Sequence, residues 1–140
     1  MERTNRESVD SGRLEDLRPV KQKGKWFHVK SDGHPLYKER FDYVDRFSEG
    51  LARVKKKGKW FHVGLDGKPT YEARFDDVHS FYEGLAEARM GDVCFHIKPD
   101  GEVAYKERFD KVGPFRKGSA EVEKGGKQFR IKPNGRFFYS

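Results

Sequence analysis

Three histidines recur at equal spacing, and their side chains could bind a metal or act as general bases. His28, His62 and His96 follow one another at intervals of 34 residues. Equivalent positions of such a repeat lie several strands apart, which at about 4.8 Å per strand separates them by roughly 10–20 Å. Zinc needs its nitrogen ligands about 2 Å from a single ion. The spacing therefore argues against a metal site and favours structural or surface histidines.

Cys94 lies two residues before His96 and is the only cysteine of the chain. A cysteine nucleophile needs a base that is oriented by a third group, together with donors for an oxyanion. No such set is visible around Cys94. It occupies the position at which two other copies of the pattern carry Trp26 and Trp60, so we expect Cys94 to fill the space of a tryptophan.

Other residues with catalytic potential are either repeated or wrongly spaced. Asp42, Asp76 and Asp110 recur in register, each two residues after an arginine. Ion pairing or turn capping explains them better than catalysis, which usually requires one asymmetric pocket. The glycines before Lys127 lack the spacing of a phosphate-binding loop. We expect no enzyme activity, no cofactor, no metal and no small-molecule substrate.

Aromatic and basic residues alternate along the same segments and could form a binding surface. Single-stranded nucleic acids are held by aromatic side chains that stack on bases and by cations that contact phosphates. The alternative is that each tryptophan packs against a neighbouring unit while the lysines solvate the turns. The last sixteen residues are also basic and contain no acid. The candidate partner-binding residues are Trp26, His28, Trp60, His62, Lys25, Lys57, Lys59, Lys127, Arg130 and Arg136.

A segment of seven residues organises the elements that carry these side chains. Residues 57–63 read Lys-Gly-Lys-Trp-Phe-His-Val, and the same letters stand at residues 23–29. Weaker copies occur around Phe95 and Phe129, always 34 residues apart. A fixed period without insertions is typical of repeat architectures. Each copy predicts a β-hairpin, because glycine at the tip supports the positive φ of a tight turn.

Alternation along the outgoing strand predicts which face is buried. Phe61 and Val63 are two residues apart and therefore share a face, which we expect to be the core. The opposite face carries Trp60 and His62 and changes chemistry from copy to copy. We therefore expect the Trp/His face to be the one available to a partner.

Two further signals complete each unit. Asp-Gly or Asn-Gly pairs follow every hairpin and predict tight turns, and a third short strand is expected around Tyr37, Tyr71, Tyr105 and Tyr139. Segments such as residues 40–47 then predict a short strand or an irregular linker. A short helix over residues 11–17 is possible, with Ser11 as its cap.

Size and composition permit a thin repeat domain. The chain has 140 residues, of which 34% are hydrophobic and 38% charged, and it carries a net charge of +7. A polar chain of this kind can stack around a narrow apolar seam. The positive charge permits polyanion partners, although 23 acidic residues among 30 basic ones favour a mixed, solvated surface. The lone cysteine, the lack of an apolar run of about 18 residues and the polar N-terminus predict a cytoplasmic protein without a membrane partner.

We predict an all-β fold in which tandem 34-residue hairpin repeats stack as an open, solenoid-like array. A small closed β-propeller is the alternative. Residues 1–16 are expected to form a flexible N-terminal arm, and residues 17–140 the repeat domain. Its units are residues 17–50, 51–84, 85–118 and 119–140.

The repeated unit resembles the WG repeat, also written KWG, of bacterial proteins. The resemblance covers residues 17–140 and is strongest at Lys59-Trp60, Asp66-Gly67, Phe75-Asp76 and residues 81–86. Where the family carries glycine after the tryptophan, this chain has Phe27 and Phe61. The resemblance implies an all-β repeat region used for binding, and it implies no common activity or catalytic residue.

These observations together predict a non-enzymatic interaction module that binds another macromolecule, another protein in the first place. The alternative is a basic protein associated with RNA or DNA, which would use the lysine-rich turns together with the Trp/His face.

Overall fold

The computed structural model describes residues 14–138. Leu14–Asp16 forms a short 3-10 helix, η1, and no α-helix is present in the described part of the chain. No helix there is long and apolar enough to cross a membrane. The strands are β1 (Arg18–Gln22), β2 (Lys25–Val29), β3 (Tyr43–Val44), β4 (Ala52–Lys56), β5 (Lys59–Val63), β6 (Asp77–Val78), β7 (Ala86–Met90), β8 (Val93–Ile97), β9 (Lys111–Val112), β10 (Ala120–Lys124) and β11 (Lys127–Ile131).

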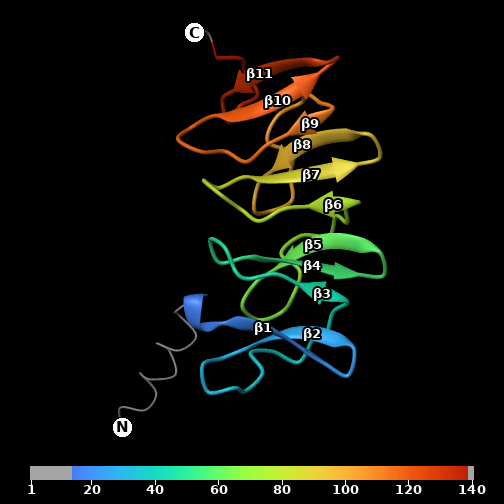
Figure 1. Ribbon diagram of the computed structural model, residues 1–140, viewed down its shortest axis with the longest axis vertical. Helices are drawn as coiled ribbons and strands as arrows, with labels where there is room; N and C mark the ends of the chain where they lie inside the picture. The colour runs from blue at the N-terminus through green and yellow to red at the C-terminus, as the bar shows by residue number, and fades with distance from the viewer. Residues whose placement is uncertain (1–13, 139–140) are drawn as a thin grey trace.

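The strands lie across the long axis of the molecule and follow one another in chain order from one end to the other (Figure 1). They form four antiparallel sheets, β1-β2, β3-β4-β5, β6-β7-β8 and β9-β10-β11. Single bridges such as Trp60–Phe75 join each hairpin to the segment that leads into the next sheet. The two ends of the stack do not meet. The prediction of an open, solenoid-like all-β array is therefore confirmed, and the closed propeller is excluded.

The hairpin turns have the geometry that the Lys-Gly pattern predicts. Lys57 and Gly58 have φ values of 53° and 80°, and Lys56 pairs with Lys59 across the turn. Positive φ at both central positions defines a type of turn whose twist matches that of the flanking strands. A second tight turn at Glu49-Gly50, with φ values of 54° and 82°, connects β3 to β4. The three-stranded sheets therefore cross the predicted unit boundaries instead of ending at them.

The predicted third strand is wrong for the units that the structure describes. After the Asp-Gly turn, Pro35 makes a single bridge to Val29, and the next bridge to β2 is made only at Phe41, with Trp26. Tyr37 turns its ring inward and is buried. A third strand would have directed every second side chain outward, whereas this tyrosine has a partner in the interior. Tyr139 lies outside the described residues.

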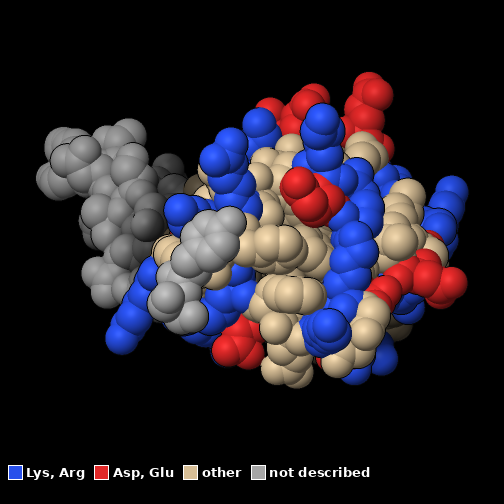
Figure 2. All heavy atoms as spheres, turned by 90° about the horizontal axis from the view of Figure 1, so that it is seen from above, with Lys and Arg blue, Asp and Glu red and all other residues tan. Residues whose placement is uncertain are grey.

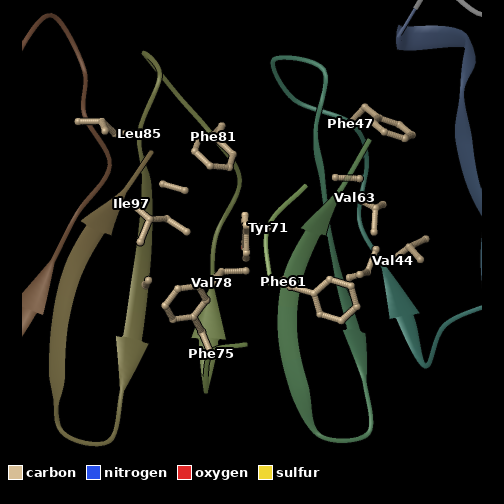
Figure 3. Close-up of a cluster of buried hydrophobic side chains, with 14 of the residues drawn as sticks. Val44, Phe47, Phe61, Val63, Tyr71, Phe75, Val78, Phe81, Leu85 and Ile97 are labelled. Atoms are coloured by element: carbon tan, nitrogen blue, oxygen red, sulfur yellow. The ribbon is translucent and has the colours of Figure 1, made fainter. Parts of the chain in front are cut away.

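The core runs along the stack between successive hairpins. Phe61 and Val63 of β5 are buried, as their alternation predicts, and Phe81 is fully buried from the loop that leads into β7. The close-up shows Tyr71 and Val78 between two neighbouring hairpins, so each unit covers the apolar side of the next (Figure 3). One hairpin alone has too little apolar area for this, which is why the unit must be repeated.

From the second unit onwards, the glycine of the Asp-Gly or Asn-Gly turn lies against the tyrosine of the preceding unit. A Cβ atom on Gly67 would come within 2.5 Å of Cγ of Tyr37, and a Cβ on Gly101 within 2.5 Å of Cγ of Tyr71. Gly67 also has a φ of +76°. The turn therefore needs glycine for its conformation and again for its contact with the neighbouring ring.

The arginine of each Arg-Phe-Asp segment bonds within its own unit, and the aspartate bonds to the next hairpin. The Nη1 group of Arg74 donates to the carbonyls of Tyr71, Glu72 and Ala73. Asp76 accepts from the Gly91 backbone N–H of the next hairpin at 2.7 Å and from Lys59 Nζ at 2.6 Å. The hypothesis of turn capping is correct for the aspartate, whereas no ion pair forms between the aspartate and its arginine. Phe61 follows the tryptophan of this unit. Its ring lies under the Arg74 guanidinium, with 3.9 Å between the guanidinium carbon and the ring centroid.

A ladder of glutamates connects the tight turns of successive units. Glu83 and Gly84 donate their backbone N–H groups to the Glu49 carboxylate, at 2.6 and 2.9 Å. The Glu83 carboxylate accepts in the same way from Lys117 and Gly118, at 2.5 and 2.9 Å. Each carboxylate thus satisfies two N–H groups that a tight turn leaves without a partner.

Glu83→Gln should lower the free energy of unfolding by about 1 kcal/mol, because hydrogen bonds to a charged acceptor are stronger than those to a neutral amide by about that amount. Urea denaturation measures the change. Glu72→Gln is the matched control, since Glu72 is exposed and its side chain makes none of these turn contacts. Equal stability of the two variants would contradict a role for the ladder.

The predicted N-terminal arm falls mostly outside the structure's description. Residues 1–13, with Ser11 as the proposed helix cap, lie outside the described residues. Leu14, at the start of η1, packs against the core, and Leu17 is fully buried. Leu14, inside the predicted arm, therefore packs with the repeat domain.

Candidate functional site

The histidines of the predicted binding face are inside the protein. His28 and His62, like His96, have no exposed surface. His62 Nδ1 lies 2.6 Å from the hydroxyl of Tyr71, and His62 Nε2 lies 2.8 Å from the carbonyl oxygen of His79. His28 and His96 have the equivalent partners. The prediction that His28 and His62 contact a partner is wrong, because the linker and the tyrosine of the same unit cover them.

The hydrogen bonds define the protonation of these rings. A carbonyl oxygen only accepts, so His62 Nε2 must donate, and in the neutral ring Nδ1 then accepts from the Tyr71 hydroxyl. Burial lowers the pKa of His62 to about 4 and that of His96 to about 4, and it also lowers the pKa of His28. Burial likewise raises the pKa of Tyr71 far above its ordinary value. These pairs are neutral structural elements, and both ring nitrogens are already occupied.

The tryptophans lie at the surface and form part of an aromatic strip. Trp26 and Trp60 are half-buried, and Tyr43 lies between them with 37% of its surface exposed. The ring centroid of Tyr43 is 5.3 Å from that of Trp26 and 5.8 Å from that of Trp60. We call Trp26, Tyr43 and Trp60 the aromatic strip. It spans the first two units across β2, β3 and β5.

Two cations lie over the Trp60 end of the strip. The guanidinium carbon of Arg53 is 4.5 Å from the Trp60 ring centroid, and Lys55 Nζ is 5.8 Å from it. Arg53 is held in place by Asp45, at 2.9 Å. Lys55 pairs across the sheet with both Tyr43 and Trp60. Aromatic rings and cations in such contact stabilise each other by roughly 0.5–1 kcal/mol at exposed sites, so the strip is pre-arranged.

The sequence pattern did not single out Tyr43. Its equivalents one and two periods later are Asp77 and Lys111, so the position looked like an unremarkable linker residue. The change of residue type at this position could have identified Tyr43, because the next position is valine in every copy. The strip also ends where Cys94 and Gln128 replace tryptophan.

The predicted basic residues fall into separate groups. Lys25 and Lys59 contact Asp42 and Asp76, at 2.9 and 2.6 Å, so their charges are partly compensated. Lys57 is exposed in the hairpin turn, and Asp42 accepts from its backbone N–H rather than from its ammonium group. The structure thus brings Lys57 and Lys59 together at one turn, away from the C-terminal cations.

The C-terminal cations lie at the other end of the stack. Lys127, Arg130 and Arg136 are all exposed. The guanidinium carbon of Arg130 lies 5.9 Å from the ring centroid of Phe138, which is 41% exposed. Viewed from that end, lysine and arginine lie on both sides of an uncharged patch, with aspartate and glutamate interspersed among them (Figure 2). These residues do not join the aromatic strip.

Cys94 fills the tryptophan position, as its sequence register predicts. It is half-buried, its thiol lies 3.5 Å from the Asp110 carbonyl oxygen, and burial raises the pKa of this thiol. The nitrogens of the neighbouring His96 are bonded to Tyr105 and Gly113. Within residues 14–138, no three His, Cys, Asp or Glu side chains gather in a way that could hold a metal ion.

Comparison with known families identifies the repeat. Three consecutive stretches, residues 31–60, 63–94 and 97–127, match the family described as WG containing repeat. The matches cover more than half of the chain, and this protein belongs to the WG repeat family. The first match starts next to the Asp32-Gly33 turn, and the second and third start at Val63 and Ile97, the last residues of β5 and β8. A comparison with curated proteins found no match.

Proposed function

We propose that this chain is a non-enzymatic interaction module that binds another protein through the aromatic strip. The observation that carries this proposal is the row of Trp26, Tyr43 and Trp60 at the surface, with centroids 5.3 and 5.8 Å apart and two cations at one end. Tryptophan, tyrosine and arginine are the residues that most often supply the binding energy of protein interfaces.

The strip is suited to binding because its side chains are already ordered. Arg53 is held by Asp45, and the three rings pack against one another. A partner that covers them would not have to immobilise long side chains, which each cost about 0.5–1.5 kcal/mol on binding. The chemistry of the partner follows from the strip: an apolar or proline-rich segment over the rings, with a carbonyl or carboxylate near Lys55.

The repeat itself offers substitutions that preserve the fold. Tyr43→Asp introduces the residue found at the equivalent Asp77, and it should weaken partner binding at least about tenfold because an aromatic anchor is lost. Affinity capture from the native cell, with quantification of the retained protein at moderately high salt, measures the effect. Tyr82→Ser is the control: Tyr82 is 41% exposed but lies off the strip, and serine is the residue at the equivalent Ser48.

Equal retention by Tyr43→Asp and the unchanged protein would contradict a binding role for the strip. The second candidate function, association with RNA or DNA, is supported by the net charge of +7 and the exposed lysines of the hairpin turns. It requires that capture disappears after nuclease treatment and falls steeply with salt, because phosphate contacts release counterions.

A further inference from the structure

A basic hollow lies at the tip of the β4–β5 hairpin. It has a volume of about 270 Å³ and is lined by Lys56, Lys57, Lys59, Phe61 and Arg74. We call it the β4–β5 hollow. Lys59 and Phe61 alternate with Trp60 along β5, so the hollow and the aromatic strip use opposite faces of the same strand.

Much of the positive charge in the hollow is not compensated. Lys59 contacts Asp76 at 2.6 Å. The ammonium groups of Lys56 and Lys57 are exposed, and no carboxylate among residues 14–138 lies within ion-pair distance of them. Their charges are therefore available to an external anion.

Arg74 forms a fixed wall of the hollow. Its guanidinium lies 3.9 Å from the Phe61 ring centroid, and Nη1 donates to three backbone carbonyls. The Nε and Nη2 groups have no hydrogen-bond partner in the part of the chain described here. A guanidinium held in this way keeps a rigid set of donors for an anion at little further cost in entropy.

The other units lack part of this cation set. At the positions of Lys56, Lys57 and Lys59, the first unit has Gln22, Lys23 and Lys25, the third has Met90, Gly91 and Val93, and the fourth has Lys124, Gly125 and Lys127. The full cation set therefore occurs once rather than as a continuous basic track. A nucleic-acid backbone, which presents a phosphate every few ångströms, would favour cations that continue from unit to unit.

We infer that the β4–β5 hollow binds the phosphate monoester of a phosphorylated side chain on a protein partner. A phosphate monoester carries close to two negative charges at neutral pH and three acceptor oxygens, which match two free ammonium groups and one fixed guanidinium. A carboxylate would leave part of this charge unpaired. The inference concerns a second site and does not depend on the aromatic strip.

The test is an amide NMR titration with a short peptide that contains one phosphoserine, beside the same peptide without phosphate. The phosphopeptide should cause saturable shifts at Gly58 and Trp60, and the unphosphorylated peptide should not. The triple variant Lys56→Met, Lys57→Gly, Lys59→Val should bind at least tenfold more weakly. It should still fold, because the third unit builds the same hairpin from these residues.

The reciprocal variant gives a gain of function. Met90→Lys, Gly91→Lys, Asp92→Gly and Val93→Lys, which together copy the Lys-Lys-Gly-Lys turn of residues 56–59, should create a second site with saturable shifts around Cys94, because Arg108 already lies over Phe95 at 4.5 Å. Shifts that rise linearly, or equally at all hairpin turns, would overturn the inference. Tighter binding of a single-stranded oligonucleotide than of the phosphopeptide, unaffected by the triple variant, would also overturn it. Tyr43→Asp should leave phosphopeptide binding intact, which separates this outcome from a failure of the proposed function.

Discussion

The free energy of unfolding should fall steeply as the pH is lowered from 6.5 towards 4. The fold keeps His28, His62 and His96 neutral, because each ring is buried and its Nε2 donates to a carbonyl. Protonation would place a second N–H against the tyrosine hydroxyl and a charge in the interior. The unfolded chain can accept these protons, whereas the folded chain resists them.

The sign follows from the number of protons that each state binds. The pKa of His62 and of His96 falls from 6.5 to about 4 on folding, so below pH 6.5 the unfolded state binds more protons. Each such histidine removes about 1.4 kcal/mol of stability per pH unit in this window, or roughly 3 kcal/mol over the whole of it. Two of them approach the total stability of a small domain, about 5–15 kcal/mol. Above pH 6.5 the stability should be fully present.

Urea denaturation monitored by tryptophan fluorescence at a series of pH values measures this slope. His34→Gln is the matched control, because it removes an exposed imidazole and keeps the three buried ones. Stability that stays constant down to pH 4 would contradict the buried neutral pairs. Asp42 and Asp76, whose pKa values are lowered by Lys25 and by the Gly91 N–H respectively, should add a further loss only below about pH 4.

Gly67→Ala should destabilise the protein by about 3 kcal/mol or more, while Gly33→Ala should cost only about 1 kcal/mol. Both glycines have positive φ, +76° and +88°, so alanine is strained by about 1–2 kcal/mol at either position. Only at Gly67 would the new methyl group meet Tyr37 Cγ at 2.5 Å. Overpacking of this kind adds about 1–3 kcal/mol.

Chemical denaturation of the two variants gives the comparison, and a double-mutant cycle identifies the contact. Tyr37→Ala removes the ring, so Gly67→Ala should cost less in that background than in the natural chain. If Gly33→Ala and Gly67→Ala are equally destabilising, the glycines serve the turn conformation alone and the contact between units has no energetic role.

The sequence predicts the hairpins well because their determinants are local. The glycines of the Lys-Gly turns and the alternation of Phe61 and Val63 act within a few residues, and a fixed period requires every unit to repeat them. The packing of one unit on the next is not local. The contact between Tyr37 and Gly67 joins residues of different units, and nothing in either segment alone indicates it.

The position of the histidines shows where alternation fails. Alternation assigns His62 to the face opposite Phe61, and the assignment of faces is correct. In an ordinary half-buried strand that face would be exposed, but here Tyr71 and the linker carbonyl of His79 cover it. Only Trp60, nearer the turn, remains at the surface. The candidate site in the structure therefore contains the predicted tryptophans and also Tyr43, but not the predicted histidines.

Proton NMR of the glycines in the Asp-Gly turns tests the central claim, that each unit is registered against the one before it through a glycine on a tyrosine ring. The contacts are Tyr37 with Gly67, Tyr71 with Gly101 and Tyr105 with Gly135. The stack predicts nuclear Overhauser effects between each ring and the Hα protons of its glycine, with ring-current shifts that Gly33 does not show, because a Cβ atom on Gly33 would meet no atom within 4 Å. Hα protons of Gly67 and Gly101 that resemble those of Gly33 and give no signal to a tyrosine ring would contradict it.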